Sequence, residues 1–154
     1  YLGCRFAGFP PEFAWKSAQK YADIVSINIY RRDIPREHEM FKITEKPLII
    51  GEFHFGALDR GMFHTGLVPC ENQKDRATNY TNYVTSVIKN PLFIGCHWFQ
   101  WTDEPITGRY FDGENYSIGL VDVTNKPYKE LVKSAQKINK KAYQIRLNES
   151  QKSR

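Results

Sequence analysis

The sequence is poor in cysteine and contains no long apolar run. Its three cysteines, Cys4, Cys70 and Cys96, are too few and too widely spaced for a disulfide-stabilised scaffold. The apolar stretches all fall far short of the roughly 20 residues that span a membrane, so we expect no membrane partner. GxGxxG, Walker A and HExxH motifs are absent too, which argues against a bound nucleotide or a zincin-type metal site and predicts no cofactor.

A leader is also lacking, because the chain begins with Tyr1 and enters an apolar run at once. We therefore expect no signal peptide within these residues. An opening inside an expected strand predicts that further sequence lies upstream of Tyr1.

Positive charge is sparse over most of the chain, although the net charge is +5. Residues 126–154 carry nine basic and two acidic residues (+7), which leaves 13 basic and 15 acidic residues (−2) in residues 1–125. A nucleic-acid groove would place lysine and arginine among the aromatic residues across the fold, so we expect no nucleic-acid partner. The hydrophobic share of 41% and charged share of 25% are those of a folded globular domain.

Short apolar runs alternate with helical patterns along the chain. Strands that are apolar on both faces and separated by helices are typical of a parallel sheet covered by helices, so the fold class is α/β. The four strand–helix units show no linker between them and predict one domain over residues 1–147 with a loose polar tail at 148–154. The patterns predict strands at 1–6, 22–30, 47–52 and 92–99, a short extended piece at 118–122, and helices at 12–21, 37–41, 71–89 and 128–145.

Polar and aromatic residues close the expected strands: Arg5, Asn28, Tyr30, Glu52 and Trp98. The carboxyl ends of parallel strands carry the sites of α/β folds, so these side chains are expected to converge. A carboxylate that ends an apolar strand needs partners, which predicts that Glu52 is a nucleophile or base. Tyr30, one strand or about 4.8 Å away, is placed to donate a hydrogen bond to it. The structural alternative is a Glu52 that reaches solvent or pairs with an arginine, with Tyr30 as a core residue.

Residues 96–105 concentrate aromatic rings beside carboxylates and amides. The flat apolar faces of Trp98 and Trp101 match the C–H faces of sugar rings, while the neighbouring polar groups suit hydroxyls. This segment therefore favours a carbohydrate site, and its alternative is a set of core aromatic residues followed by a turn.

Two longer stretches resemble one family. KPLIIGEFHFGA at 46–57 and WFQWTDEPITGR at 98–109, with DGEN at 112–115, are similar to the C-terminal half of the β-agarases of glycoside hydrolase family 50. At a coarser level, Asn-x-Tyr, Gly-Glu and Trp at successive strand ends resemble strands six, seven and eight of a clan A retaining glycoside hydrolase, and the opening residues fit strand five.

The resemblance implies a (β/α)₈ TIM barrel, of which this chain supplies strands five to eight. It also implies retaining hydrolysis of β-galactosidic bonds in agar-type galactans, and a bacterial protein that is secreted or periplasmic. Glu52 matches the nucleophile, Tyr30 its hydrogen-bonding tyrosine and Trp98 the platform under the reacting sugar. Further substrate contacts are expected at Arg5, His54, Trp101, Asp103, Glu104 and Arg109.

The same resemblance implies that something is missing. The clan's general acid/base is a glutamate after an asparagine at the end of strand four, and no such pair precedes the strand-five segment here. A barrel also takes about 250 residues. We therefore expect the chain alone to be inactive, to expose two sheet edges and an apolar interior face, and to need the N-terminal half of the barrel or self-association.

Two other functions stay open at the level of sequence. A non-catalytic relative would keep the aromatic cleft and bind carbohydrate without cleaving it. A metal-dependent hydrolase would use His54, His97 and Glu52 as ligands, although the close His/Cys spacing of metal sites is absent.

Overall fold

The computed structural model describes residues 3–35 and 37–152 and shows four strands and five helices there. The four expected strands are present, and the first three expected helices lie within two residues of their predicted bounds. What was expected of residues 1 and 2 lies outside the described part of the chain. The elements run in the order β1 (Gly3–Phe6), α1 (Glu12–Tyr21), β2 (Ile24–Ile27), α2 (Glu39–Lys42), β3 (Leu48–Phe53), α3 (Gln73–Lys89), β4 (Phe93–Trp98), α4 (Lys129–Lys140) and α5 (Ala142–Lys152).

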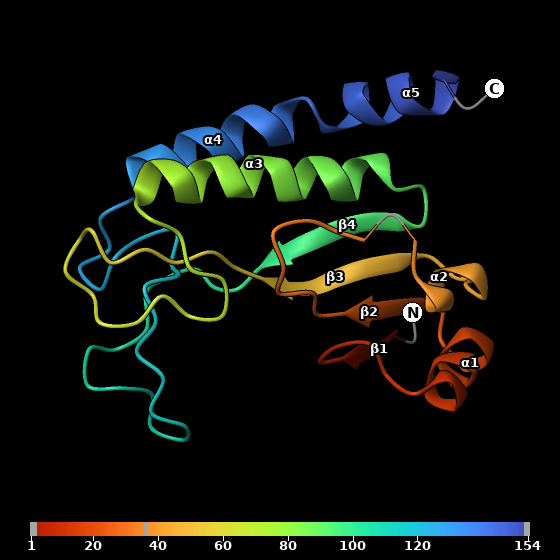
Figure 1. The fold of residues 1–154 in the computed structure, drawn as a ribbon, viewed down its shortest axis with the longest axis horizontal. Helices are drawn as coiled ribbons and strands as arrows, with labels where there is room; N and C mark the ends of the chain where they lie inside the picture. The colour runs from red at the N-terminus through yellow and green to blue at the C-terminus, as the bar shows by residue number, and fades with distance from the viewer. Residues whose placement is uncertain (1–2, 36, 153–154) are drawn as a thin grey trace.

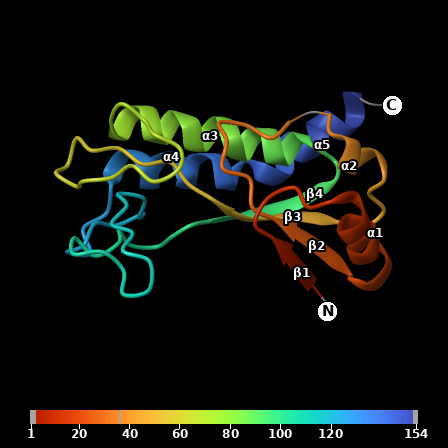
Figure 2. The same ribbon diagram turned by 60° about the horizontal axis from the view of Figure 1, so that its bottom comes forward.

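The strands form one parallel sheet in the order β1-β2-β3-β4, so each strand pairs with its sequence neighbour. Helix α3 lies over β3 and β4 with α4 beside it, and α1 packs near β1 and β2 at the other end of the sheet (Figures 1 and 2). The long loops gather at one end of the sheet, where the strands finish (Figure 1). No helix in the described residues has both the length and the apolar character of a membrane span.

The core lies between the sheet and its helices. Val25, Ile27, Leu48 and Ile50 alternate along β2 and β3 and are fully buried on the covered face. They pack in one cluster with Trp15 of α1 and with side chains of α3 and α4. The strand pattern therefore arises because β-branched and leucine side chains fill the space beneath the helices.

The opposite face of the sheet is less apolar than the sequence predicted. The register aligns Arg5, Ser26, Ile49 and Gly95 in one row across the four strands. One charged, one hydroxyl, one aliphatic and one glycine residue share this row. The expectation of an apolar interior face is thus wrong along it, because strand pairing brings polar residues of β1 and β2 into line.

The C-terminal region differs most from prediction. One helix over 128–145 was expected, but α4 and α5 meet at Lys141, which caps α4. Residues 148–152 belong to α5 and are not loose; residues 153 and 154 are outside the description. Arg146 explains this ordering, because it donates hydrogen bonds to the carbonyl oxygens of Asn90 (2.9 Å) and Phe93 and so anchors α5 at the start of β4.

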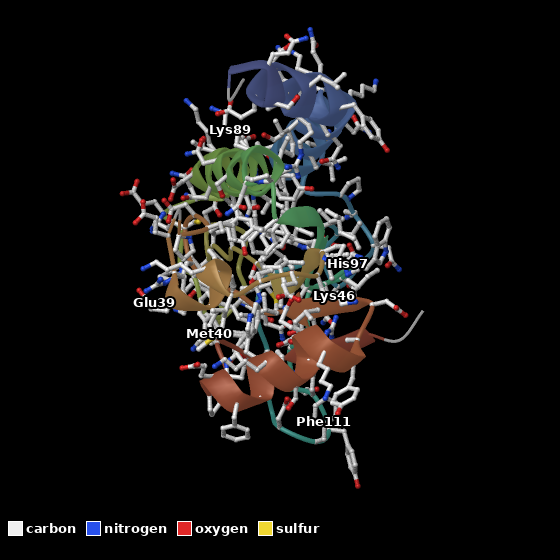
Figure 3. The ribbon with its side chains drawn as sticks, turned by 90° about the vertical axis from the view of Figure 1, so that its right-hand side faces the viewer. Glu39, Met40, Lys46, Lys89, His97 and Phe111 are labelled. Atoms are coloured by element: carbon white, nitrogen blue, oxygen red, sulfur yellow. The ribbon has the colours of Figure 1, made fainter. Side chains whose placement is uncertain are left out.

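Two long loops, 54–72 and 99–128, pack against each other. A bridge joins His64 to Tyr116, and the Ser117 N–H donates to the His64 carbonyl at 2.7 Å. In the short extended piece expected at 118–122, Val121 forms isolated bridges with Thr102 and Pro127, and no strand is present there. Phe111 lies in the second loop, on the far side of the molecule from Lys89 at the end of α3 (Figure 3).

Candidate active site

Glu52 lies near the carboxyl end of β3, where the pairing with β4 shifts register between Ile50 and Phe53. The residue before it, Gly51, approaches β1 and β2 closely. A Cβ added there would lie 2.5 Å from the Ser26 Oγ, nearer than any ordinary contact. Glycine therefore lets the polar side chains of the neighbouring strands close around the carboxylate.

Three donors, one on β1 and two in the segment after β2, converge on Glu52. Arg5 Nη1 lies 2.8 Å from Oε1 as an ion pair. Asn28 Nδ2 and Tyr30 Oη each donate to Oε2 at 2.7 Å. Hydrogen bonds to a charged acceptor are stronger than neutral ones, so both oxygens of the carboxylate are fixed in position and its negative charge is stabilised.

The hydrogen bond from Tyr30 to Glu52 is the one that strand alternation predicted, and the arginine partner corresponds to the alternative of a paired carboxylate. Asn28 was expected among the converging strand-end residues, but its contact with Glu52 was not predicted. The two-residue spacing between Asn28 and Tyr30 could have predicted this contact, because it puts both side chains on the same face of the sheet.

Tyr30 stays protonated over the whole working range of pH. Burial first, and then its hydrogen bond to Glu52, raise the pKa of the phenol far above its usual value. The ring of His54 lies against it at a centroid distance of 4.7 Å. Tyr30 therefore acts as a fixed hydrogen-bond donor and not as an acid.

His54 is an interior residue and is not presented to a ligand. It is 1% exposed, and its Nε2 accepts a hydrogen bond from the Leu67 N–H at 2.8 Å. Burial, with a smaller effect of the positive charge of Arg76, lowers the pKa of His54 to about 4. A neutral, enclosed imidazole fits a structural role, so the expected substrate contact at His54 is not supported.

Trp98 is partly buried at the end of β4, and its indole N–H donates to the Ile118 carbonyl at 2.9 Å. Its ring meets Phe53 edge-on at 5.2 Å and lies 5.4 Å from the ring of Tyr80. Trp101, by contrast, is 67% exposed and presents its indole outwards. The two tryptophans therefore differ, one held from three sides and one free to stack on a partner.

Asp103 and Glu104, two of the expected substrate contacts, are 2% and 0% exposed. Asp103 accepts hydrogen bonds from the Gly119 N–H and from the Tyr128 hydroxyl, and burial raises its pKa. Glu104 accepts from the Tyr116 N–H at 2.9 Å. Both carboxylates fold back on loop 99–128 because the loop's backbone donors must be satisfied.

Arg109 is committed to the same loop. It pairs with Asp112 at 2.6 Å, with Glu114, and with Glu104 at 3.4 Å. Three acidic partners surround one guanidinium, so Arg109 has little capacity left for a sugar hydroxyl. It shapes the loop that carries Phe111, over whose ring its guanidinium lies at 4.8 Å.

The structure does not assemble the metal ligands that the sequence left open. His54 is buried whereas His97, the exposed side chain before Trp98, lies on β4 (Figure 3). Across residues 3–35 and 37–152, no group of three or more His, Cys, Asp or Glu side chains is placed to hold a metal ion. The geometry thus favours a carboxylate site over a metal site.

No protein-family model matches the chain. Among curated proteins it is similar to Beta-agarase B of Vibrio sp. (strain JT0107), at 49% identity over 150 residues. That match covers 95% of this chain but 16% of the relative.

Solved structures give the same result. An exo-beta-agarase superposes with a TM-score of 0.91 at 50% identity, over 96% of this chain and 20% of that chain. PfGH50B superposes with a TM-score of 0.88 at 47% identity, over 95% of this chain and 21% of that chain. The chain therefore spans 16–21% of the length of these relatives and matches one part of their fold.

Proposed function

This chain is homologous to part of the β-agarases of glycoside hydrolase family 50, and we propose that it is the nucleophile-bearing part of a retaining β-galactan hydrolase. The observation that carries the proposal is the carboxylate of Glu52, held by Arg5, Asn28 and Tyr30 at the carboxyl end of a parallel strand. Its substrate is a β-galactosidic bond of an agar-type galactan.

The proposed architecture is a (β/α)₈ barrel in which β1 to β4 are strands five to eight. Four parallel strands paired in sequence order, with helices on their covered face, support it. The row of Arg5, Ser26, Ile49 and Gly95 on the opposite face would then line the barrel interior. Residues 1–147 would belong to the catalytic domain. Strands β1 and β4 are the edges at which the other strands would pair.

In the proposed mechanism Glu52 attacks the anomeric carbon while the glycosidic oxygen leaves. A second carboxyl group protonates that oxygen and then removes a proton from the water that cleaves the glycosyl ester. Arg5, Asn28 and Tyr30 hold the carboxylate of Glu52 in a fixed orientation, because each donates a hydrogen bond to one of its oxygens.

The sugar is proposed to stack on Trp98, with Trp101 as an outer contact and Arg5 within reach of its hydroxyls. Trp98 is supported in this role by its fixed orientation, and Trp101 by its exposure. His54, Asp103 and Glu104 are left out of this set because they are buried, and Arg109 because it pairs with acidic residues of its own loop.

The general acid/base is proposed to come from outside these residues. Glu104 is buried and Glu114 is paired with Arg109, so neither is free to serve opposite Glu52. The chain alone is therefore expected to be inactive on agarose. Its partner would be the N-terminal half of the barrel, or a second copy that pairs with the open edges of the sheet.

A chimaera tests the proposal. This chain replaces the matching 150 residues of Beta-agarase B, whose 49% identity makes the exchange conservative, and the product is assayed on agarose. We expect hydrolysis by the chimaera, background rates for its Glu52→Gln variant, and full activity for Glu71→Gln, an exposed glutamate on the loop before α3. Near wild-type turnover by Glu52→Gln would remove Glu52 from its role.

Chemical rescue separates a nucleophile from a residue that merely shapes the site. In the Glu52→Gly chimaera, azide occupies the space of the carboxylate and attacks the anomeric carbon of an activated aryl β-galactoside, which releases the phenol. We expect azide to restore release of the phenol and to give the α-galactosyl azide. A chimaera that binds agarose without any hydrolysis would instead identify a carbohydrate-binding relative.

A further inference from the structure

Arg76 is a buried cation that the proposed mechanism does not use. It lies in the first turns of α3, is 0% exposed, and uses all three of its nitrogens. Nε donates to the Phe55 carbonyl at 2.6 Å, Nη1 to the Gln73 side chain at 3.1 Å and Nη2 to the Gly119 carbonyl at 2.7 Å. The guanidinium therefore links helix α3 to both long loops.

The preceding peptide, between Ile118 and Gly119, is held through the Gly119 N–H. This N–H donates to Asp103 Oδ1 at 2.7 Å, and the Tyr128 hydroxyl donates to the second oxygen of that carboxylate. A Cβ added to Gly119 would lie 2.2 Å from the Asp103 nitrogen and from the Val121 carbonyl oxygen, both backbone atoms. The backbone at Gly119 is therefore packed too closely against residues 103 and 121 to admit any side chain.

Trp98 is fixed by the same peptide group. Its indole N–H donates to the Ile118 carbonyl, which belongs to the planar unit that contains the Gly119 N–H. The Arg76 guanidinium also lies 5.6 Å from the Trp98 ring and 4.9 Å from the Tyr128 ring. One planar peptide therefore connects a buried ion network to the orientation of the indole.

We propose that Arg76, Asp103 and Tyr128 are positioning residues for Trp98. Asp103, held by Tyr128, fixes the peptide 118–119 whose carbonyl orients the indole, and Arg76 fixes the adjoining peptide 119–120. The inference rests on the proposed function for one point only, that Trp98 lies under the reacting sugar. Replacing a buried ion network with apolar residues is often neutral or stabilising. This network therefore fits a role in orienting Trp98 better than a role in stability.

Hydrogen exchange of the indole N–H in the 154-residue chain tests the structural link without reference to activity. Tyr128→Phe removes one hydroxyl from the network, and Arg76→Lys removes the forked donors while keeping the charge. We expect the Trp98 indole and the Gly119 amide to exchange at least about tenfold faster in both variants, while amides of β2 keep their protection.

The matched control is Arg32→Lys. Arg32 also donates to a backbone carbonyl, that of Pro69 at 2.9 Å, and its other hydrogen bond goes to the Asn79 side chain and not to the network around Trp98. Its Trp98 indole should exchange as in the unsubstituted chain. Uniform acceleration at every amide, or unchanged exchange at Trp98 in Tyr128→Phe, would overturn the proposal.

The chimaera with Beta-agarase B tests the consequence for the sugar. We expect Tyr128→Phe to raise KM for agarose about tenfold while kcat changes less than about threefold, because a misplaced platform weakens binding of substrate and transition state together. An unchanged KM would overturn the link to the sugar. If the unsubstituted chimaera is inactive, the proposed function fails, and the exchange measurement alone decides the positioning role.

Discussion

Replacing Gly51 with alanine tests how tightly the side chains pack around Glu52. The new Cβ would lie 2.5 Å from Ser26 Oγ, 2.6 Å from Asn28 Oδ1 and 2.8 Å from Arg5 Nε. These atoms belong to Arg5 of β1, Ser26 of β2 and Asn28, which follows β2 directly. Arg5 and Asn28 also hold the carboxylate of Glu52. Alanine therefore displaces the donors of the carboxylate.

The expected magnitude follows from two opposing effects. Alanine in a strand is favoured over glycine by about 0.5–1 kcal/mol because the unfolded chain loses less entropy. Overpacking costs about 1–3 kcal/mol. The midpoints of these two ranges leave the Gly51→Ala chain about 1 kcal/mol less stable, which for a chain of this size lowers Tm by about 2–4 °C.

Gly95→Ala is the matched control, since Gly95 lies on the same face one strand away. Its Cβ would meet Ile49 at 3.8 Å, an ordinary van der Waals contact. This variant is therefore expected to gain about 0.5–1 kcal/mol.

Thermal unfolding followed by circular dichroism measures both variants. The protein concentration is held fixed, because Tm of a self-associating chain depends on it. A Gly51→Ala chain as stable as the unsubstituted one, or an equal loss in Gly95→Ala, would refute the packing argument.

Three further outcomes are expected. Tyr30→Phe in the chimaera lowers kcat/KM about 10- to 100-fold, because it removes a hydrogen bond to a charged acceptor, and unchanged kinetics would contradict this role. The pKa of His54 is about 4 in the folded chain and about 6.5 in the unfolded chain, so the unfolded chain binds more protons between these pH values. The free energy of unfolding therefore falls by up to about 3 kcal/mol as the pH drops from 6.5 to 4. Urea titrations of His54→Gln should show no such dependence of the free energy of unfolding on pH. Arg146→Ala removes the hydrogen bonds of a charged donor to the Asn90 and Phe93 carbonyls and costs about 1–3 kcal/mol, with faster proteolysis within α5 as the readout. Equal cleavage rates would contradict the anchoring contact.

The strands and the Tyr30–Glu52 contact were accessible to prediction. Runs such as 47–52 are apolar on both faces, which identifies a buried parallel strand without knowledge of its neighbours. Alternation then places Tyr30 on a known face of the adjacent strand. These features depend on local periodicity, so they can be predicted without knowing the conformation of the loops.

The burial of the two loop carboxylates, Asp103 and Glu104, could not be predicted from the sequence. Asp103 and Glu104 follow two tryptophans and looked like sugar contacts, yet their partners Gly119, Tyr128 and Tyr116 lie 12 to 25 residues away in sequence. Sequence pattern carries no information about how a loop of that length folds back on itself. The polar groups turned inwards because the buried loop backbone required acceptors.

Sequence alone determined the α/β pattern, the strand-end position of Glu52 and the resemblance to one glycosidase family, because periodicity and short motifs are local properties of the chain. Tertiary structure alone decided that Arg5 and Asn28 join Tyr30 at Glu52, and it placed three expected sugar contacts, His54, Asp103 and Glu104, in the interior. The physical reason is that burial and hydrogen bonding are settled between segments distant in sequence, when strands pair and loops close over one another.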